Sequence, residues 1–247
     1  METYKKTALT IPVNCFPGKL SRSTLILFLA YFTIVCNACK KEDNSLKYGS
    51  MTDQDGNTYK TIAIGTQTWM AENLRTTTYR NGEPIANITD NAAWETINNG
   101  AYCTLENTTD NAIITTYGML YNWLAVTDSR NIAPAGWHMP SDDEWATLIT
   151  YLGGEIEAGG KMKEAGTAHW SSMNIDATNK SGFTAVPSSY RNIDGSFGYF
   201  GVGCYLWSNT QSSTYSAFNI NLKSYNGRCI RNIFLIELGL SVRLVKD

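Results

Sequence analysis

The sequence predicts an α+β fold, because helical patterns fill the first half of the domain and strand patterns fill the second. Apolar residues recur at helical spacing in two segments between residues 115 and 152. From residue 182 onward, short runs of β-branched and aromatic residues are separated by Gly, Asn-Gly and Asp-Gly turns, which is typical of antiparallel strands. Helical segments followed by strand segments indicate the α+β class. The composition, with 43% hydrophobic and 17% charged residues, is that of a globular domain.

The N-terminus is predicted to be a signal peptide rather than part of the fold. Basic residues within the range 5–22 precede an apolar run from Leu25 to Val35, which is too short to span a bilayer comfortably. Ala38 and Cys39 follow and resemble a bacterial lipobox, and KED at 41–43 resembles the surface-export signal of lipoproteins in Bacteroidetes-type bacteria. An ordinary signal peptide cleaved near Cys39 is the alternative.

We therefore expect an outer-membrane lipoprotein that is exposed on the cell surface. Residues 1–38 would be removed, Cys39 would carry acyl chains, and residues 39–50 would form a polar tether to a domain at residues 51–247. More than one acyl chain makes such anchoring stable. Because the sequence contains no second apolar segment of spanning length, the lipid anchor is the only expected contact with the membrane.

The domain is predicted to begin with a hairpin or with the entry to a strand. Asp55-Gly56 is a tight-turn signal, and residues 57–70 alternate between side-chain types as strands do. A short helix is expected after Thr89 or Asp90, followed by a strand at residues 100–105.

Three further helices are predicted, and the middle one is the most strongly specified. Residues 115–128 are expected to form one helix and residues 159–166 a brief one after a Gly-Gly hinge. Between them, Ser141 and Glu144 form a capping-box pattern, and acidic residues in the first turn suit the helix dipole. Gly153-Gly154 ends this helix. Its predicted buried face comprises Trp145, Leu148, Ile149 and Leu152. The acidic residues are therefore interpreted as helix chemistry rather than as a catalytic or metal site.

Three cysteines remain once the leader is removed: Cys103, Cys204 and Cys229. Exported proteins usually pair their cysteines, and an odd number leaves one free or paired outside the chain. Cys204 and Cys229 both lie in the region predicted to form antiparallel strands, so we expect a disulfide between them.

Six ordered blocks of sequence span roughly residues 53–247: DQDGNTYKTIAIGTQTWMAENLR, YGMLYNWLAV, APAGWHMPSDDEWATLITYLGG, SGFTAVPS, YLWSNT and GLSVRLVKD. Together they resemble the Fibrobacter succinogenes major paralogous domain. Residues 140–145 also resemble the P-T-x-x-E-W block of formylglycine-generating enzymes, which have a C-type-lectin-like fold. The resemblance implies two main helices packed on a twisted antiparallel sheet with long loops. It places in the core the tryptophans inside the blocks: Trp69, Trp123, Trp137, Trp145 and Trp207.

No metal or catalytic constellation stands out in the sequence. It has only two histidines, His138 and His169, and neither HxxxH nor CxxC, so zinc is not expected. DQDGN at 53–57 fails the spacing of an EF-hand loop and is predicted to be a hairpin turn. The calcium motifs of C-type lectins are matched only in part, at residues 83–85 and 207–209. Because no set of nucleophile, base and orienting group is visible, we expect no enzymatic activity, no metal and no cofactor.

Binding is the expected function. A net charge of −2 without a basic stripe argues against nucleic acid as a partner. Loops held by a rigid core carry function, and aromatic side chains on them can dock a sugar or a peptide strand. The candidate ligand-binding residues are Trp94, Trp170, Tyr190 and Tyr199, with core packing as the alternative for each. The expected partner is an extracellular glycan or protein. The alternative functions are an exported enzyme-like relative of formylglycine-generating enzymes and a structural component of the cell envelope.

Overall fold

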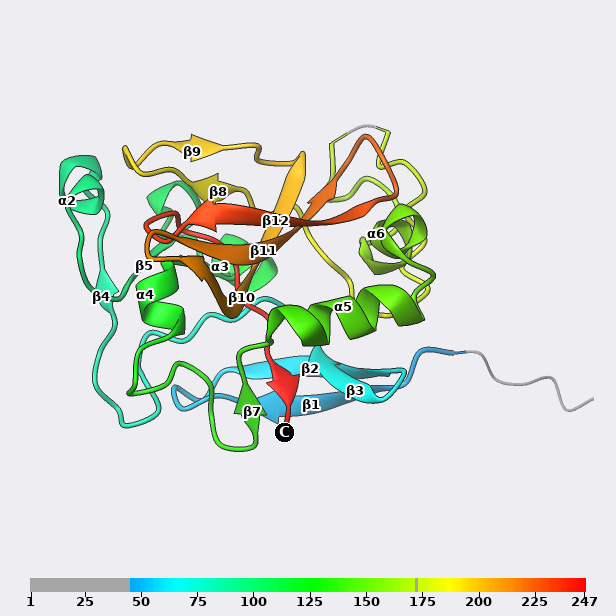
Figure 1. Ribbon diagram of the computed structural model, residues 1–247, viewed down its shortest axis with the longest axis horizontal. Helices are drawn as coiled ribbons and strands as arrows, with labels where there is room; N and C mark the ends of the chain where they lie inside the picture. The colour runs from blue at the N-terminus through cyan, green and yellow to red at the C-terminus, as the bar shows by residue number, and fades with distance from the viewer. Residues whose placement is uncertain (1–44, 172) are drawn as a thin grey trace, which may run out of the picture. The chain divides into compact units, whose positions relative to one another are not determined.

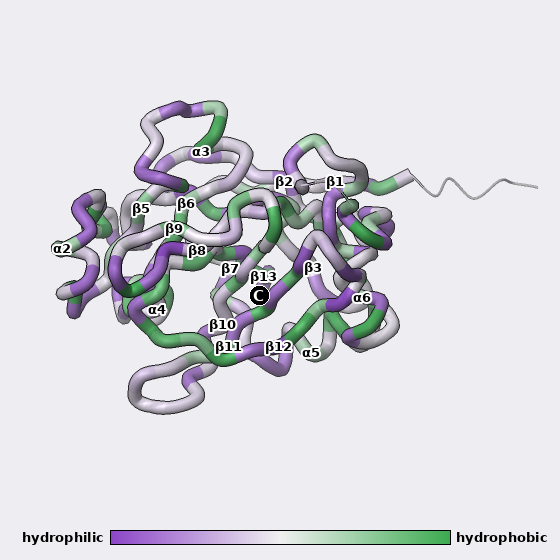
Figure 2. The backbone as a smooth tube through the Cα atoms, turned by 90° about the horizontal axis from the view of Figure 1, so that it is seen from above, coloured by the Kyte–Doolittle hydropathy of each residue, from purple (hydrophilic) through white to green (hydrophobic). Residues whose placement is uncertain are grey.

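The computed structural model describes residues 45–171 and 173–247, so the predicted signal peptide, Cys39 and the first half of the predicted tether lie outside the described residues. Residues 46–247 form one unit of short helices and mostly antiparallel sheets, which confirms the predicted α+β mixture (Figure 1). None of the helices in the described part is both long enough and apolar enough to span a bilayer. Apolar stretches along the backbone are short and alternate with polar ones (Figure 2).

The N-terminal hairpin and the last strand share one antiparallel sheet. Its strands, in spatial order, are β1 (Tyr48–Thr52), β2 (Thr58–Ile64), β3 (Gln67–Met70), β13 (Val245–Lys246) and β7 (Trp137–His138). The turn after β1 is held by the Asp53 carboxylate, which accepts hydrogen bonds from the N–H of Asp55 (3.0 Å) and of Asn57 (2.9 Å). The Tyr59 hydroxyl also donates to this carboxylate, at 2.6 Å. The predicted hairpin turn is confirmed, and the Asp53 carboxylate already accepts hydrogen bonds from within the protein.

A second sheet divides the core, because alternation along its strands gives each face its own apolar set. It consists of β10 (Gly203–Ser213), β11 (Ser216–Lys223) and β12 (Cys229–Leu235), all antiparallel. One face, which includes Leu206 and Ile220, packs against α5 (Asp142–Tyr151) and α6 (Glu155–Met162). The opposite face, which includes Tyr205 and Trp207, belongs to a separate large cluster.

The remaining elements are short. They are β4 (Ala86–Asn87), α2 (Asn91–Glu95), β5 (Ala101–Thr104), η1 (Leu105–Asn107), α3 (Asn111–Tyr117), β6 (Met119–Tyr121), α4 (Trp123–Val126), β8 (Tyr190–Arg191) and β9 (Phe197–Gly198). Strands β4, β5 and β6 form a small sheet, and β8 pairs with β9. The short helix expected after Asp90 is confirmed as α2, which Asp90 caps, and the strand expected at residues 100–105 is confirmed as β5.

The single helix predicted for residues 115–128 is wrong, because Gly118 divides the segment. Gly118 follows α3 with a φ of 71°, a conformation that favours glycine. The chain then forms β6, and Asn122 caps the separate helix α4 by accepting a hydrogen bond from the N–H of Ala125 (3.0 Å). The apolar residues of this segment are buried in three different elements rather than on one helix face.

Helix α5 confirms the predicted capping box and buried face, whereas α6 lies earlier than predicted. The Ser141 hydroxyl accepts from the Glu144 N–H (3.2 Å), and the Glu144 carboxylate accepts from the Ser141 N–H (2.8 Å). The five tryptophans assigned to the core are all buried. Helix α6 begins directly after Gly153-Gly154 and includes Gly159, where an added Cβ would lie 2.2 Å from the Arg228 carbonyl oxygen. The helix ends at Met162, so residues 163–166 are not helical. Gly159 allows close packing against the Arg228 backbone rather than forming a hinge.

The predicted Cys204–Cys229 disulfide is wrong. The three cysteines in the described part of the chain are free and buried. Cys204 on β10 and Cys229 on β12 both lie opposite Leu222 of the central strand β11. Neighbouring strands are about 4.8 Å apart, so the two Cα atoms are about 9.6 Å apart, beyond the roughly 4.4–6.8 Å of a disulfide. Burial raises the pKa of the Cys204 thiol to about 11, which makes it a poor nucleophile.

Candidate functional site

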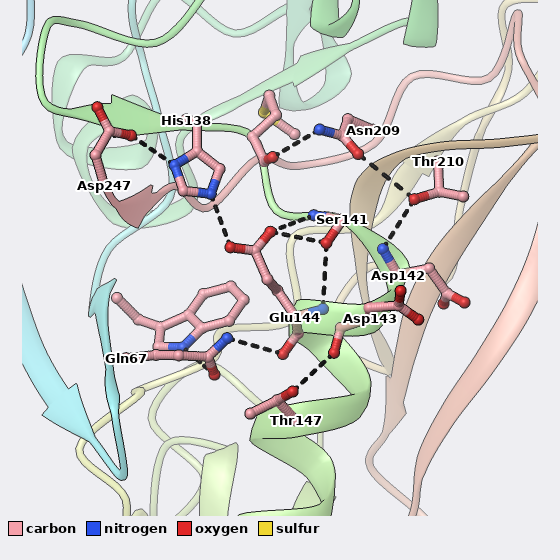
Figure 3. Close-up of polar contacts among 12 residues, drawn as sticks. Gln67, His138, Ser141, Asp142, Asp143, Glu144, Thr147, Asn209, Thr210 and Asp247 are labelled. Atoms are coloured by element: carbon pink, nitrogen blue, oxygen red, sulfur yellow. Dashed lines mark hydrogen bonds and ion pairs between the residues drawn. The ribbon is translucent and has the colours of Figure 1, made fainter.

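The capping box of α5 continues into a hydrogen-bonded cluster around His138 (Figure 3). His138 Nε2 lies 2.8 Å from Glu144 Oε1, and His138 Nδ1 lies 2.6 Å from Asp247 Oδ1. The cluster thereby joins β7, the start of α5 and the residue after β13. The Ser141 hydroxyl bonds to Glu144 and not to His138, so the arrangement lacks the nucleophile–base contact of a Ser-His-Asp site.

The electrostatics of the cluster suit a structural clasp between these three segments. Burial lowers the pKa of His138, but its hydrogen bonds to Glu144 and Asp247 outweigh this effect, and the net shift is upward. A carboxylate at each ring nitrogen favours the imidazolium, which donates at both. Among the described residues, no group of three or more His, Cys, Asp and Glu side chains is arranged to hold a metal ion.

The clasp is expected to make stability depend on pH. The pKa of His138 is raised in the folded protein, so its contribution is present below the unfolded pKa of about 6.5 and is lost as pH rises through the folded pKa. Urea unfolding of the wild type and of His138→Gln, at about pH 5.5 and about pH 9, tests this. The difference in free energy of unfolding between the two proteins should shrink at the higher pH. An equal difference at both pH values would contradict the clasp.

A second candidate site lies where three loops meet beside the second sheet. We call it the loop surface and define it as residues 171, 173–175, 199–202 and 223–226. Backbone hydrogen bonds join the loops, from Ser171 to Gly201 (2.7 Å), from Ser224 to Val202 (2.9 Å) and from Ile175 to Ser224 (2.7 Å). In Figure 1 the turn between β11 and β12 accordingly lies beside the loop that follows α6. Segments distant in the sequence are thereby held as one surface.

The loop surface concentrates large apolar side chains in contact with solvent. The exposed fractions are 71% for Met173, 54% for Tyr199, 52% for Tyr225, 49% for Phe200 and 38% for Ile175. A single exposed apolar residue is ordinary, whereas several on loops that adjoin one another favour an interaction site.

Tyr199 is held in a fixed orientation by aromatic neighbours. Its ring stacks on that of Tyr190, with centroids 5.9 Å apart, and Tyr190 meets Tyr205 edge to face at 5.1 Å. Tyr199 also has a φ of 64°, which residues other than glycine seldom adopt and which tends to occur at functional loops. The exposed ring is therefore presented by a preformed loop.

Lys163 links two of the three loops through hydrogen bonds from its side chain. Its side chain is fully buried, and Nζ donates to the carbonyl oxygens of Ile175 (2.8 Å), Lys223 (2.9 Å) and Asn226 (2.8 Å). Burial lowers the pKa of Lys163 to about 8. All three donors of the ammonium group are used, so this lysine is a structural tie.

The structure brings together two of the four candidate ligand-binding residues, Tyr190 and Tyr199. Trp94 and Trp170 are only 0% and 2% exposed, so their assignment to a binding surface is wrong. The Arg191 guanidinium covers Trp94 at 4.5 Å from the ring centroid, and Lys163 Nζ lies 5.5 Å from that of Trp170. Both tryptophans are buried in apolar clusters, and the cationic group of a long side chain lies over each ring.

Phe200, Met173 and Lys223 are absent from the predicted site although the structure places them in the loop surface. A signal for Phe200 exists, since Tyr199 and Phe200 stand between two glycines in a predicted loop. Met173 and Lys223 carry no comparable local signal, because their role depends on which loops meet.

Comparison with known proteins identifies a family. The model of the family described as Fibrobacter succinogenes major domain matches residues 62–246. No curated protein and no solved structure matches the chain.

Proposed function

The chain belongs to the Fibrobacter succinogenes major domain family, and we propose that its loop surface is a non-catalytic binding site for an extracellular glycan or protein. The observation that carries this proposal is the group of exposed apolar side chains on three loops that backbone hydrogen bonds hold together. Rigid presentation reduces the ordering cost of binding. The buried cysteines, whose thiols are poor nucleophiles, give the alternative of an exported enzyme no comparable support.

The proposal extends to the finer fold and to the location of the protein. We propose a C-type-lectin-like fold, which is supported by the two main helices α5 and α6 packed on an antiparallel sheet with loops gathered beside it. We also propose a lipoprotein anchored through Cys39 and exposed on the outer membrane, supported by the leader pattern of the sequence. Metabolic labelling with a palmitate analogue tests the anchor, since Cys39→Ala should abolish the label.

Tyr199→Ala is expected to weaken binding by about tenfold or more, because exposed aromatic anchors dominate binding energies and about 1.4 kcal/mol corresponds to a factor of ten. A screen of the purified protein against polysaccharides, mucins and matrix proteins first identifies ligands, and titration calorimetry then compares the variants. Tyr151→Ala is the matched control, because Tyr151 is 64% exposed but lies on α5, outside the loop surface. Equal losses in both variants, or none in Tyr199→Ala, would place binding elsewhere.

A further inference from the structure

Lys223 is a cation within the loop surface that lacks an anionic partner. Its Nζ lies 4.4 Å from the ring centroid of Tyr199 and 4.1 Å from that of Tyr205, and it donates to the Tyr205 hydroxyl. In the described part of the chain, Lys223 forms no ion pair with a carboxylate. The two rings stabilise the ammonium group, but they leave two of its three N–H donors without a hydrogen-bond partner that the structure records.

Comparison with Lys163 shows how few hydrogen-bond partners Lys223 has. Burial lowers the pKa of both side chains to about 8. Lys163 compensates with three carbonyl acceptors, whereas Lys223 has one hydroxyl. Of these two partly desolvated cations, Lys223 is therefore the one that would gain from an added anion.

A row of polar groups on β11 continues from Lys223 along the same face of the sheet. Asn221 and Asn219 lie two and four residues before Lys223, opposite Tyr205 and Trp207 of β10. They are 6% and 1% exposed, and Asn221 Oδ1 and both polar side-chain atoms of Asn219 lack a hydrogen-bond partner among the described residues. These atoms are too deeply buried to be reached from the loop surface, so they mark polar groups within the sheet rather than ligand contacts.

The backbone of the loop surface argues against an added peptide strand. Ser171, Ile175 and Ser224 donate their N–H groups to neighbouring loops, so these donors are not free to pair with an extended chain. Aromatic rings and an ammonium group with two unused N–H donors instead match a ligand that combines a flat ring face, hydroxyl groups and a negative charge.

We propose that the loop surface binds an acidic oligosaccharide, with a carboxylate of the sugar paired to the Lys223 ammonium group and a sugar ring against the exposed part of the Tyr199 ring. This inference rests on the proposed function and adds the class of ligand to it.

The test compares uronic-acid oligosaccharides with their carboxyl-reduced forms, which keep the linkage and lose the charge. Titration calorimetry at about pH 7 should show that the wild type prefers oligogalacturonate over its reduced form by at least about tenfold, as a charge-assisted contact predicts. Lys223→Met keeps the aliphatic stem against the rings and should remove the preference. Lys60→Met is the matched control, because Lys60 also lies over a tyrosine ring, at 5.9 Å, but on β2.

The preference should also fall as pH rises from about 7 to about 9.5, because the pKa of Lys223 is about 8. The titratable groups around it are Tyr190, Tyr199, Tyr205 and Tyr225, Cys204 on the other face of β10, and Lys163, which donates to the Lys223 carbonyl oxygen. Because the pKa of Lys163 is also about 8, binding of the reduced sugar must stay constant over this range for the fall to be assigned to Lys223. Burial raises the pKa of Tyr190, of Tyr205 and of Cys204, the last to about 11, so these groups keep their protons over most of this range.

The inference is overturned by equal binding of the acidic and reduced sugars, by a preference that survives in Lys223→Met, or by binding of acidic peptides without any acidic sugar. Binding of a neutral glycan that Tyr199→Ala abolishes would overturn the acidic ligand while supporting the proposed function. Binding that neither Tyr199→Ala nor Lys223→Met changes would overturn both.

Discussion

Arg191→Met is expected to lower the free energy of unfolding by about 3–5 kcal/mol or to prevent folding, because leaving several buried acceptors unsatisfied costs about 1–3 kcal/mol each. Arg191 is 0% exposed, and its guanidinium carbon lies over two aromatic rings, 4.5 Å from the Trp94 centroid and 5.3 Å from that of Phe197. Its guanidinium donates to the carbonyl oxygens of Ile88, Thr89 (3.1 Å) and Gly195 (3.1 Å).

The position of Arg191 extends this effect to the binding site. Arg191 belongs to β8 and stands directly after Tyr190, which supports the Tyr199 ring. Its hydrogen bonds attach the β8–β9 hairpin to the segment before α2. A variant that still folds should therefore bind ligand more weakly than the wild type.

Urea unfolding followed by tryptophan fluorescence measures the effect, with two comparison variants. Arg191→Lys keeps the charge but not the planar fork of donors, so an intermediate loss is expected. Arg228→Met replaces an arginine whose side chain is 52% exposed and should change stability by less than about 0.5 kcal/mol. If Arg191→Met matched Arg228→Met, the guanidinium would not be the anchor of the hairpin.

Local signals in the sequence were sufficient where one element carries its own pattern. The capping box of Ser141 and Glu144 predicted the start of α5, and the turn signal of Asp55-Gly56 predicted the first hairpin. These features depend on groups within a few residues of one another. The α+β class, which is confirmed, was predictable because it follows from adding up such local patterns.

Features that depend on burial from several directions were not predictable in this way. The apolar residues of the segment 115–128 suggested one helix, but the positive φ at Gly118 separates α3 from β6. Cys204 and Cys229 both lie in strands as predicted, yet the intervening β11 keeps them apart. Neither strand order nor a backbone conformation is contained in residue spacing.

The candidate site was predictable only as a set of loop aromatics. Tyr190 and Tyr199 are close in sequence and meet in space, whereas Met173 and Lys223 join them through hydrogen bonds between distant loops. Lys163, which holds those loops, is a charged residue that ordinary patterning places at the surface, but it is fully buried.

Lys163→Met is expected to lower the free energy of unfolding by about 3 kcal/mol or more, since it leaves three largely buried carbonyl oxygens without a donor. Unlike Arg191→Met, it acts directly beneath the loop surface, because the carbonyls belong to Ile175, Lys223 and Asn226. The expected signature is therefore double, with a lower urea midpoint and weaker ligand binding at temperatures where the variant is fully folded. Thermal and urea unfolding measure the first effect, and calorimetric titration measures the second.

Lys180→Met is the control for Lys163→Met, because Lys180 is exposed and should tolerate the change. If Lys163→Met loses stability but binds ligand as the wild type does, the loops hold their shape without the tie and rigidity comes from their backbone bonds alone. If Lys163→Met is as stable as the wild type, the buried ammonium group contributes no more to the free energy of unfolding than the methionine side chain that replaces it. Only the combined loss identifies Lys163 as the residue that couples the core to the binding surface, since a purely local effect on folding would leave the affinity of the folded protein unchanged.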